Sequence, residues 1–151
     1  ETAYQDSRMK ASITYLHLLR HTPFFTELND DQLKWVIKHS REWDSPAGTV
    51  IDSRIEGVTP SADLWVLLDG GWQVETENSA HSAGNGTPGK WYSSSAMQSD
   101  NRLVTIRRSY VMRIKAADME DMLAKDFPFR SHLSTGHAWY KHIGVGQSNM
   151  P

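Results

Sequence analysis

Short apolar segments separated by turn residues fill the middle of the chain, and this pattern limits the fold more than any other feature. The turn Pro46-Ala47-Gly48 marks the change from a helical to a strand-like period. Beyond it, apolar runs predict strands at 49–51, 64–68, 72–75, 103–106 and 110–114. Short strands at such spacing are typical of a closed barrel or of two packed sheets.

The turns between these segments predict how the strands pair. Asp69-Gly70-Gly71 is expected to join the strands on either side of it as a hairpin, and Arg107 to Ser109 to join the last two strands. Residues 76–90 are rich in Ser, Asn, Gly and Pro, which predicts a long polar loop.

Helical patterns precede the strands. Apolar residues recur at helical spacing from about Tyr4 to Arg20, which predicts a first helix. Asn29 is expected to cap a second helix, because Gln32 three residues later completes a capping box.

Two further helices are expected after the strands. One begins near Asp118 and ends at Pro128, and the other covers 129–142 with a weak point at Gly136 and a frayed tail at 144–151. We therefore assign the α+β, mainly β class: a double-stranded β-helix, or jelly-roll β-roll, flanked by N- and C-terminal helices. Residues 1–130 are assigned to the β-roll with its N-terminal helices, and 131–151 to a C-terminal helix and tail of the same domain.

The composition excludes several function classes. The 151 residues include no cysteine, so disulfides, thiolate metal sites and cysteine nucleophiles are absent. A net charge of −2 gives no basic surface for nucleic acid or an anionic membrane, and no apolar run is long enough to cross a bilayer. We expect a cytoplasmic protein with no nucleic-acid or membrane partner.

Four segments in a fixed order resemble the cyclic-nucleotide-binding domain family. They read LRHTPFFTELNDDQLKWVI, PAGTVI, LWVLLDGGWQV and YVMRIKAADMEDML, within residues 16–130. They match the entry helices, the first strand, the central strand–glycine–strand signature, and the closing strand with the helix after it. The resemblance implies a β-roll with a regulatory function and no enzymatic activity.

The family's phosphate-binding cassette falls on GKWYSSSAM (89–97) and NRLVTI (101–106), and we call residues 91–105 within this stretch the cassette-like segment. Arg102 takes the place of the arginine that binds the cyclic phosphate, and Thr105 that of the threonine in the next strand. Ser93 replaces the family's glycine, and Ser94 replaces the glutamate that holds the ribose. The resemblance therefore implies a ligand site made of Trp91, Ser93, Ser94, Ser95, Ala96, Arg102 and Thr105.

Losing the glutamate changes the expected ligand. A charge-assisted hydrogen bond contributes about 1.5–3 kcal/mol, against about 0.5–1.5 kcal/mol for a neutral one. Ser94 should therefore weaken nucleotide binding by about tenfold or more. We expect a cyclic nucleotide or another small anion as a weak ligand, and no other cofactor.

Catalytic and metal sites are not expected. No G-x-S-x-G elbow surrounds the serines. His17 and His21 have i,i+4 spacing at a helix end, which also suits solvated or capping histidines. A cupin-like metalloenzyme is a second alternative, but the chain lacks a G-x-H-x-H-type motif.

Two functions follow from this reading. The first is a regulatory or sensory domain that relays ligand or partner binding through its C-terminal helix. The second is a ligand-free interaction or dimerisation domain with a vestigial pocket. Trp139 and Tyr140 of the C-terminal helix are candidates to cap a ligand in the first case, or to pack on a partner subunit in the second. A DNA-binding helix-turn-helix is not expected, because too few residues follow Phe129.

Overall fold

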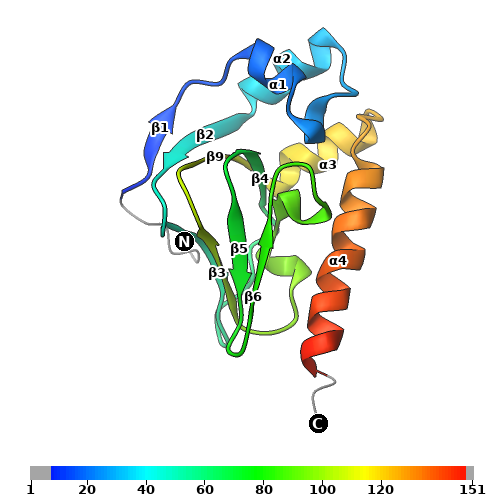
Figure 1. Cartoon of the computed structure of the whole chain (residues 1–151). Helices are drawn as coiled ribbons and strands as arrows, with labels where there is room; N and C mark the ends of the chain where they lie inside the picture. Colours follow the sequence, from blue (N-terminus) through cyan, green and yellow to red (C-terminus); the bar gives the residue numbers. More distant parts are fainter. Residues whose placement is uncertain (1–7, 149–151) are drawn as a thin grey trace.

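Two antiparallel β-sheets form the body of the molecule, and a computed structural model describes them within residues 8–148 (Figure 1). The five-stranded sheet has the order β1 (Lys10–Ser12), β2 (Ser40–Ser45), β9 (Ser109–Ile114), β4 (Leu64–Asp69), β7 (Trp91–Tyr92). The four-stranded sheet has the order β3 (Val50–Arg54), β8 (Asn101–Thr105), β5 (Trp72–Glu75), β6 (Ala80–Ala83). This architecture confirms the predicted β-roll with flanking helices.

Both predicted hairpins are wrong. The strands on either side of each turn belong to different sheets: β4 pairs with β7 and β9, whereas β5 pairs with β6 and β8. At these corners Gly71 N–H donates to Ser109 Oγ, which in turn donates to the Gly71 carbonyl, each at 3.0 Å. Gly70 has φ +104°, and a Cβ there would overlap Ser109. The turns therefore pass the chain from one sheet to the other.

The N-terminal region also differs from the prediction. In place of one helix to Arg20, the structure has strand β1, which pairs with β2, and a short helix α1 (Leu16–Arg20). Residues 4–7 of the predicted helix lie outside the described residues. Strand β2 was not predicted, because its sequence SREWDS is mostly polar. It includes Glu42, which is buried and accepts a hydrogen bond from Ser12 Oγ at 2.9 Å.

The other helices agree better with the sequence pattern. A 3-10 turn η1 (Pro23–Phe25) precedes α2 (Asp30–Lys38), and Asn29 and Gln32 form the predicted capping box. Helix α3 (Ala116–Ala124) ends before Pro128, because the chain turns at Asp126 with φ +64°. Helix α4 (Arg130–Ser148) is longer than expected, and 149–151 of the predicted tail lie outside the described residues. The predicted loop 76–90 contains β6 and a second 3-10 turn, η2 (Pro88–Lys90).

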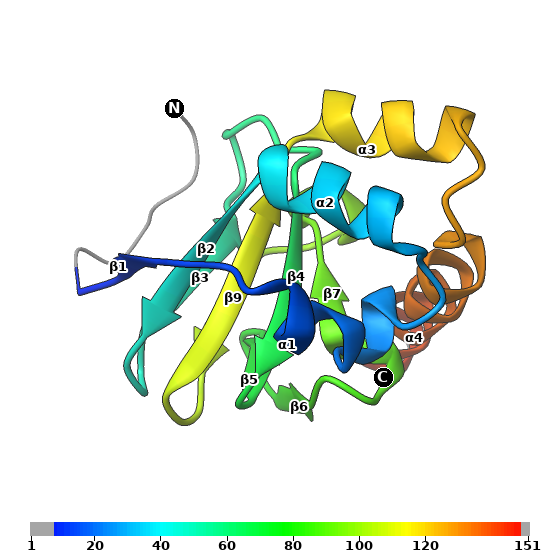
Figure 2. The ribbon, with the colours of Figure 1, turned by 90° about the horizontal axis from the view of Figure 1, so that it is seen from above.

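Helix α4 runs beside the two sheets (Figures 1 and 2). Its residues Tyr140 and Ile143 are buried in the same apolar core as Phe24 and Phe129. The boundary that we place after residue 130 stays a prediction. Within residues 8–148, no helix is both long and apolar enough to cross a membrane.

Candidate functional site

The cassette-like segment starts with β7, whose two residues point to opposite faces of the sheet. Tyr92 lies opposite Trp65, and its hydroxyl donates to Asn101 Oδ1 on β8 at 2.6 Å, so the ring crosses the space between the sheets. Trp91 lies on the other face, where its Nε1 donates to the His132 carbonyl on α4 at 2.9 Å. Trp91 therefore contacts the C-terminal helix, not the interior of the roll.

The serines form the next turn, η3 (Ser94–Ala96), which is tied to Ser61 in the loop before β4. Ser94 is buried, and its hydroxyl both donates to the Ser61 carbonyl at 3.0 Å and accepts from the Ser61 N–H at 2.8 Å. Ser93 Oγ donates to the same carbonyl at 3.1 Å and lies 2.8 Å from Ser95 Oγ. The hydroxyls that the resemblance assigns to a ligand thus already bind protein groups.

Arg102 lies on the outer face of the four-stranded sheet. Alternation along β8 buries Asn101 and Leu103 and leaves the Arg102 side chain 57% exposed. Its guanidinium donates from Nε and Nη2 to Glu75 Oε1 at 3.1 and 2.6 Å, and this hydrogen bond lowers the pKa of Glu75. A ligand that used Arg102 would have to displace Glu75.

Ala96 and Thr105 have structural contacts as well. The Ala96 N–H donates to the Ser93 carbonyl at 2.9 Å within the turn. Buried Thr105 donates its hydroxyl to the Pro46 carbonyl at 2.6 Å and accepts from the Thr49 N–H at 2.9 Å, which fixes the turn before β3. The role of all seven predicted residues toward a ligand stays a prediction.

The space between the sheets contains a buried acid. Asp52 on β3 lies opposite Leu103 and is 1% exposed. Its Oδ1 accepts from the Ser53 N–H at 2.8 Å, and within the described residues its Oδ2 has no partner at hydrogen-bond geometry. Burial raises the pKa of Asp52 to about 6. Large side chains, among them Trp65 and Tyr92, are also fully buried there. This interior is therefore mostly apolar and contains one buried acidic group, that of Asp52.

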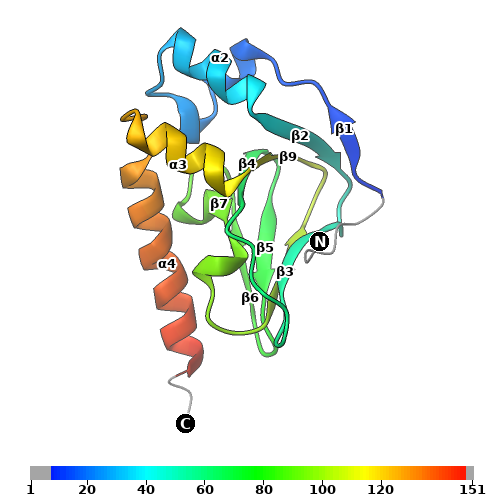
Figure 3. The ribbon, with the colours of Figure 1, turned by 180° about the vertical axis from the view of Figure 1, so that it is seen from behind.

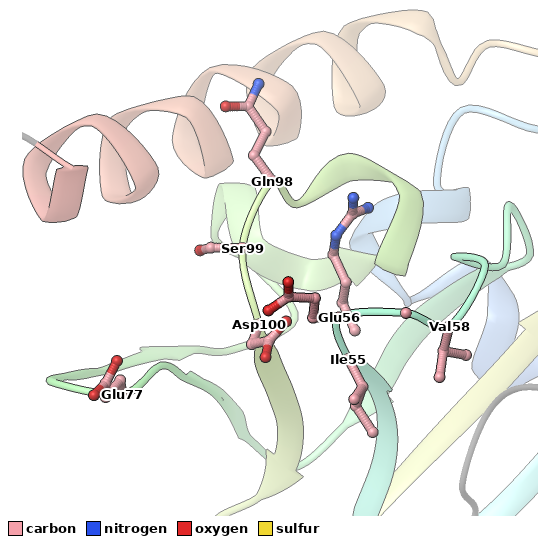
Figure 4. Close-up of a pocket in the computed structure, with 9 residues that line it drawn as sticks. Ile55, Glu56, Val58, Glu77, Gln98, Ser99 and Asp100 are labelled. Carbon is pink, nitrogen blue, oxygen red and sulfur yellow. The ribbon is translucent and has the colours of Figure 1, made fainter.

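A cavity of about 510 Å³ adjoins the end of the cassette-like segment (Figure 4). Three acidic residues line it, Glu56, Glu77 and Asp100, together with a single cation, Arg54. The Arg54 guanidinium donates to the Ser94 carbonyl at 3.2 Å. Figure 4 shows Glu56 and Asp100 reaching toward one another. Because carboxylates outnumber cations, the potential in this cavity opposes a phosphate.

The residues that contact the cassette-like segment were not predicted from the sequence. Ser61 and Arg54 lie far from it along the chain, and no motif marks either of them. Alternation along β5 and β8 places both Glu75 and Arg102 on the outer face of the sheet, and this could have been predicted. The register that pairs the two residues could not be predicted from the sequence. Among the residues that the structure describes, no group of three or more His, Asp or Glu side chains could hold a metal ion.

The fold is shared with solved structures. PKAR CBD2 with bound Sp-2Cl-cAMPS is 14% identical, with TM-score 0.64, over 91% of this chain and 90% of that one. A putative cyclic nucleotide-binding protein from Geobacter metallireducens GS-15 is 21% identical, with TM-score 0.57, over 87% and 98%. A CooA variant from Carboxydothermus hydrogenoformans is 12% identical, with TM-score 0.61, over 88% and 90%. No protein-family model matches the sequence, and no curated protein matches it significantly.

These likenesses show that the chain has the fold of the cyclic-nucleotide-binding domain. The order of helices, two sheets and C-terminal helices agrees with the resemblance that the four sequence segments carry.

Proposed function

We propose that the chain is a regulatory domain in which the cassette-like segment controls the position of helix α4. The solved structures with the same fold are nucleotide-binding and sensor domains, which supports a regulatory role over an enzymatic one. The observation that carries the proposal is the direct contact between β7 and α4.

Strand β7 lies beside α4 (Figure 3), and Trp91 is the centre of their contact. Its indole donates to the His132 carbonyl, and the Tyr140 hydroxyl donates to the Trp91 carbonyl. Gly136 lets α4 approach the indole, since a Cβ at this position would overlap the ring. His137 packs edge-on at 5.0 Å between ring centroids. A displacement of β7 would therefore displace α4.

The ligand specificity is altered in this proposal. The hydroxyl of Ser94 is engaged by Ser61 and the guanidinium of Arg102 by Glu75, so a cyclic nucleotide would have to break both contacts. The breaking of these contacts opposes binding by about 1 kcal/mol or more. We propose weak binding of cyclic nucleotides or another small anion, with no other cofactor.

The same internal contacts favour a second candidate function. If the cassette-like segment is permanently closed, the domain acts as a ligand-free interaction module. In that case a protein partner or a second copy of the chain would bind the exposed face of α4.

The relay can be tested with Ser94→Ala, because the side-chain hydrogen bonds of Ser94 go to Ser61 and not to α4. The substitution leaves the partly buried Ser61 N–H without its acceptor, at a cost of about 1 kcal/mol. We expect hydrogen exchange in α4 to accelerate several-fold while exchange in β2 and β9 changes less. Ser99→Ala, at an exposed position just past the turn, is the control. Unchanged α4 exchange in Ser94→Ala would exclude the relay.

A further inference from the structure

A second cavity, of about 480 Å³, lies where the end of α2 and the start of β2 meet the end of β9 and the start of α3. It shares no lining residue with the cassette-like segment. Its lining includes four permanent cations, Lys38, Arg41, Arg113 and Lys115, against a single carboxylate, that of Asp118. This charge is the reverse of the acidic cavity beside the cassette-like segment.

Most of this positive charge is not neutralised. Arg113 donates to Asp63 Oδ2 at 2.7 Å, and the other Asp63 oxygen accepts from the Ala116 N–H at 3.0 Å. Within residues 8–144, Lys38, Arg41 and Lys115 form no ion pair. The cavity therefore still has more positive than negative groups when Asp63 is included.

The strand register places two of the cationic residues opposite one another. Arg41 on β2 pairs directly with Arg113 on β9. Like charges at such positions destabilise a sheet, and an anion bound in the cavity would reduce this repulsion.

Trp43 forms an aromatic part of the cavity wall. The Arg41 guanidinium lies 4.8 Å from the centre of the Trp43 ring, so the cation and the ring are neighbours. The Trp43 Nε1 is buried and has no acceptor within the described part of the chain, so this N–H does not face the open cavity.

We propose that this cavity binds a small phosphate-bearing anion. Two guanidinium and two ammonium groups match a dianion with several acceptor oxygens better than a carboxylate. The cavity is larger than a phosphate ion needs, which leaves room beside Trp43 for an organic group. The site is independent of the proposed function, because it involves neither the cassette-like segment nor α4.

Calorimetry of the whole chain with inorganic phosphate and with phenyl phosphate tests the proposal, at constant ionic strength. We expect saturable binding of one ion per chain, weakened about tenfold in Arg41→Gln and in Lys38→Gln. Lys34→Gln is the control, since it removes the same charge from an exposed position of α2 outside the cavity. Tighter binding of phenyl phosphate would assign an ester as the ligand, and equal binding the free ion.

Two results would overturn the proposal. One is the absence of saturation by either probe up to about 10 mM. The other is equal weakening in Lys34→Gln, which would indicate general electrostatic attraction. Thermal melts of the variants show whether each is folded.

Discussion

Gly136→Ala is expected to destabilise the domain by about 2 kcal/mol or more, although alanine is the better helix former. The added Cβ would overlap the indole of Trp91, which is 1% exposed and held by its bond to His132. The ring cannot move aside without breaking that bond, so α4 must shift outward. A chain of this size should lose about 4–8 °C in melting temperature.

Gly144→Ala is the matched control in the same helix. Apart from its own helix backbone, no atom of the described residues lies within 4 Å of a Cβ at that position. Alanine there should stabilise the domain by about 0.5–1 kcal/mol through helix propensity alone. If Gly136→Ala were as stable as Gly144→Ala, α4 would not be in close contact with Trp91 and the proposed relay would lose its physical basis.

Asp52→Asn is expected to stabilise the domain by about 2 kcal/mol near neutral pH. The carboxyl group is fully buried with one oxygen unpartnered, and its pKa is raised to about 6. Because the folded chain holds the proton more tightly than the unfolded chain, stability is highest below the unfolded pKa. It is lost as the pH rises through the folded pKa.

The measurement is urea unfolding of both proteins between about pH 4.5 and about pH 7.5. Over this pH range, the free energy of unfolding of the parent chain should fall by about 2 kcal/mol more than that of Asp52→Asn. Burial also lowers the pKa of His132 and raises that of Glu42, and both groups are present in the two proteins, so the difference reports Asp52. Parallel pH profiles would show that Asp52 is solvated in the folded chain.

The sequence was sufficient to place most strands but not to pair them. The strands at 64–68 and 72–75 were both predicted from their sequence patterns. The hairpin predicted between them was wrong, because Gly70 and Gly71 form a corner at which the chain passes from one sheet to the other. Local periodicity reports that a segment is buried, whereas its partners depend on contacts distant in sequence. Strand β2 was missed for a related reason, since its buried residues include the polar Glu42.

The candidate site shows the same difference between local sequence patterns, which were predictable, and contacts between distant segments, which were not. In the structure the cassette-like segment comprises β7, the turn η3 and β8, and its role toward a ligand stays a prediction. The side-chain environments could not be predicted, because Ser61, Glu75 and Asp52 come from other strands and loops. A one-residue alternation decides that Arg102 points outward and Asn101 inward, and this phase is set by tertiary packing.

The chain has the fold of the cyclic-nucleotide-binding domain, and we propose that its ligand chemistry is altered. Titration of the chain with cyclic AMP and cyclic GMP, followed by tryptophan fluorescence and calorimetry, tests it most directly. We predict no saturation below about 1 mM, with the same result in Arg102→Ala. Saturable binding at micromolar concentrations that is lost in Arg102→Ala would contradict the account, because it would require Arg102 to leave Glu75 and hold the phosphate.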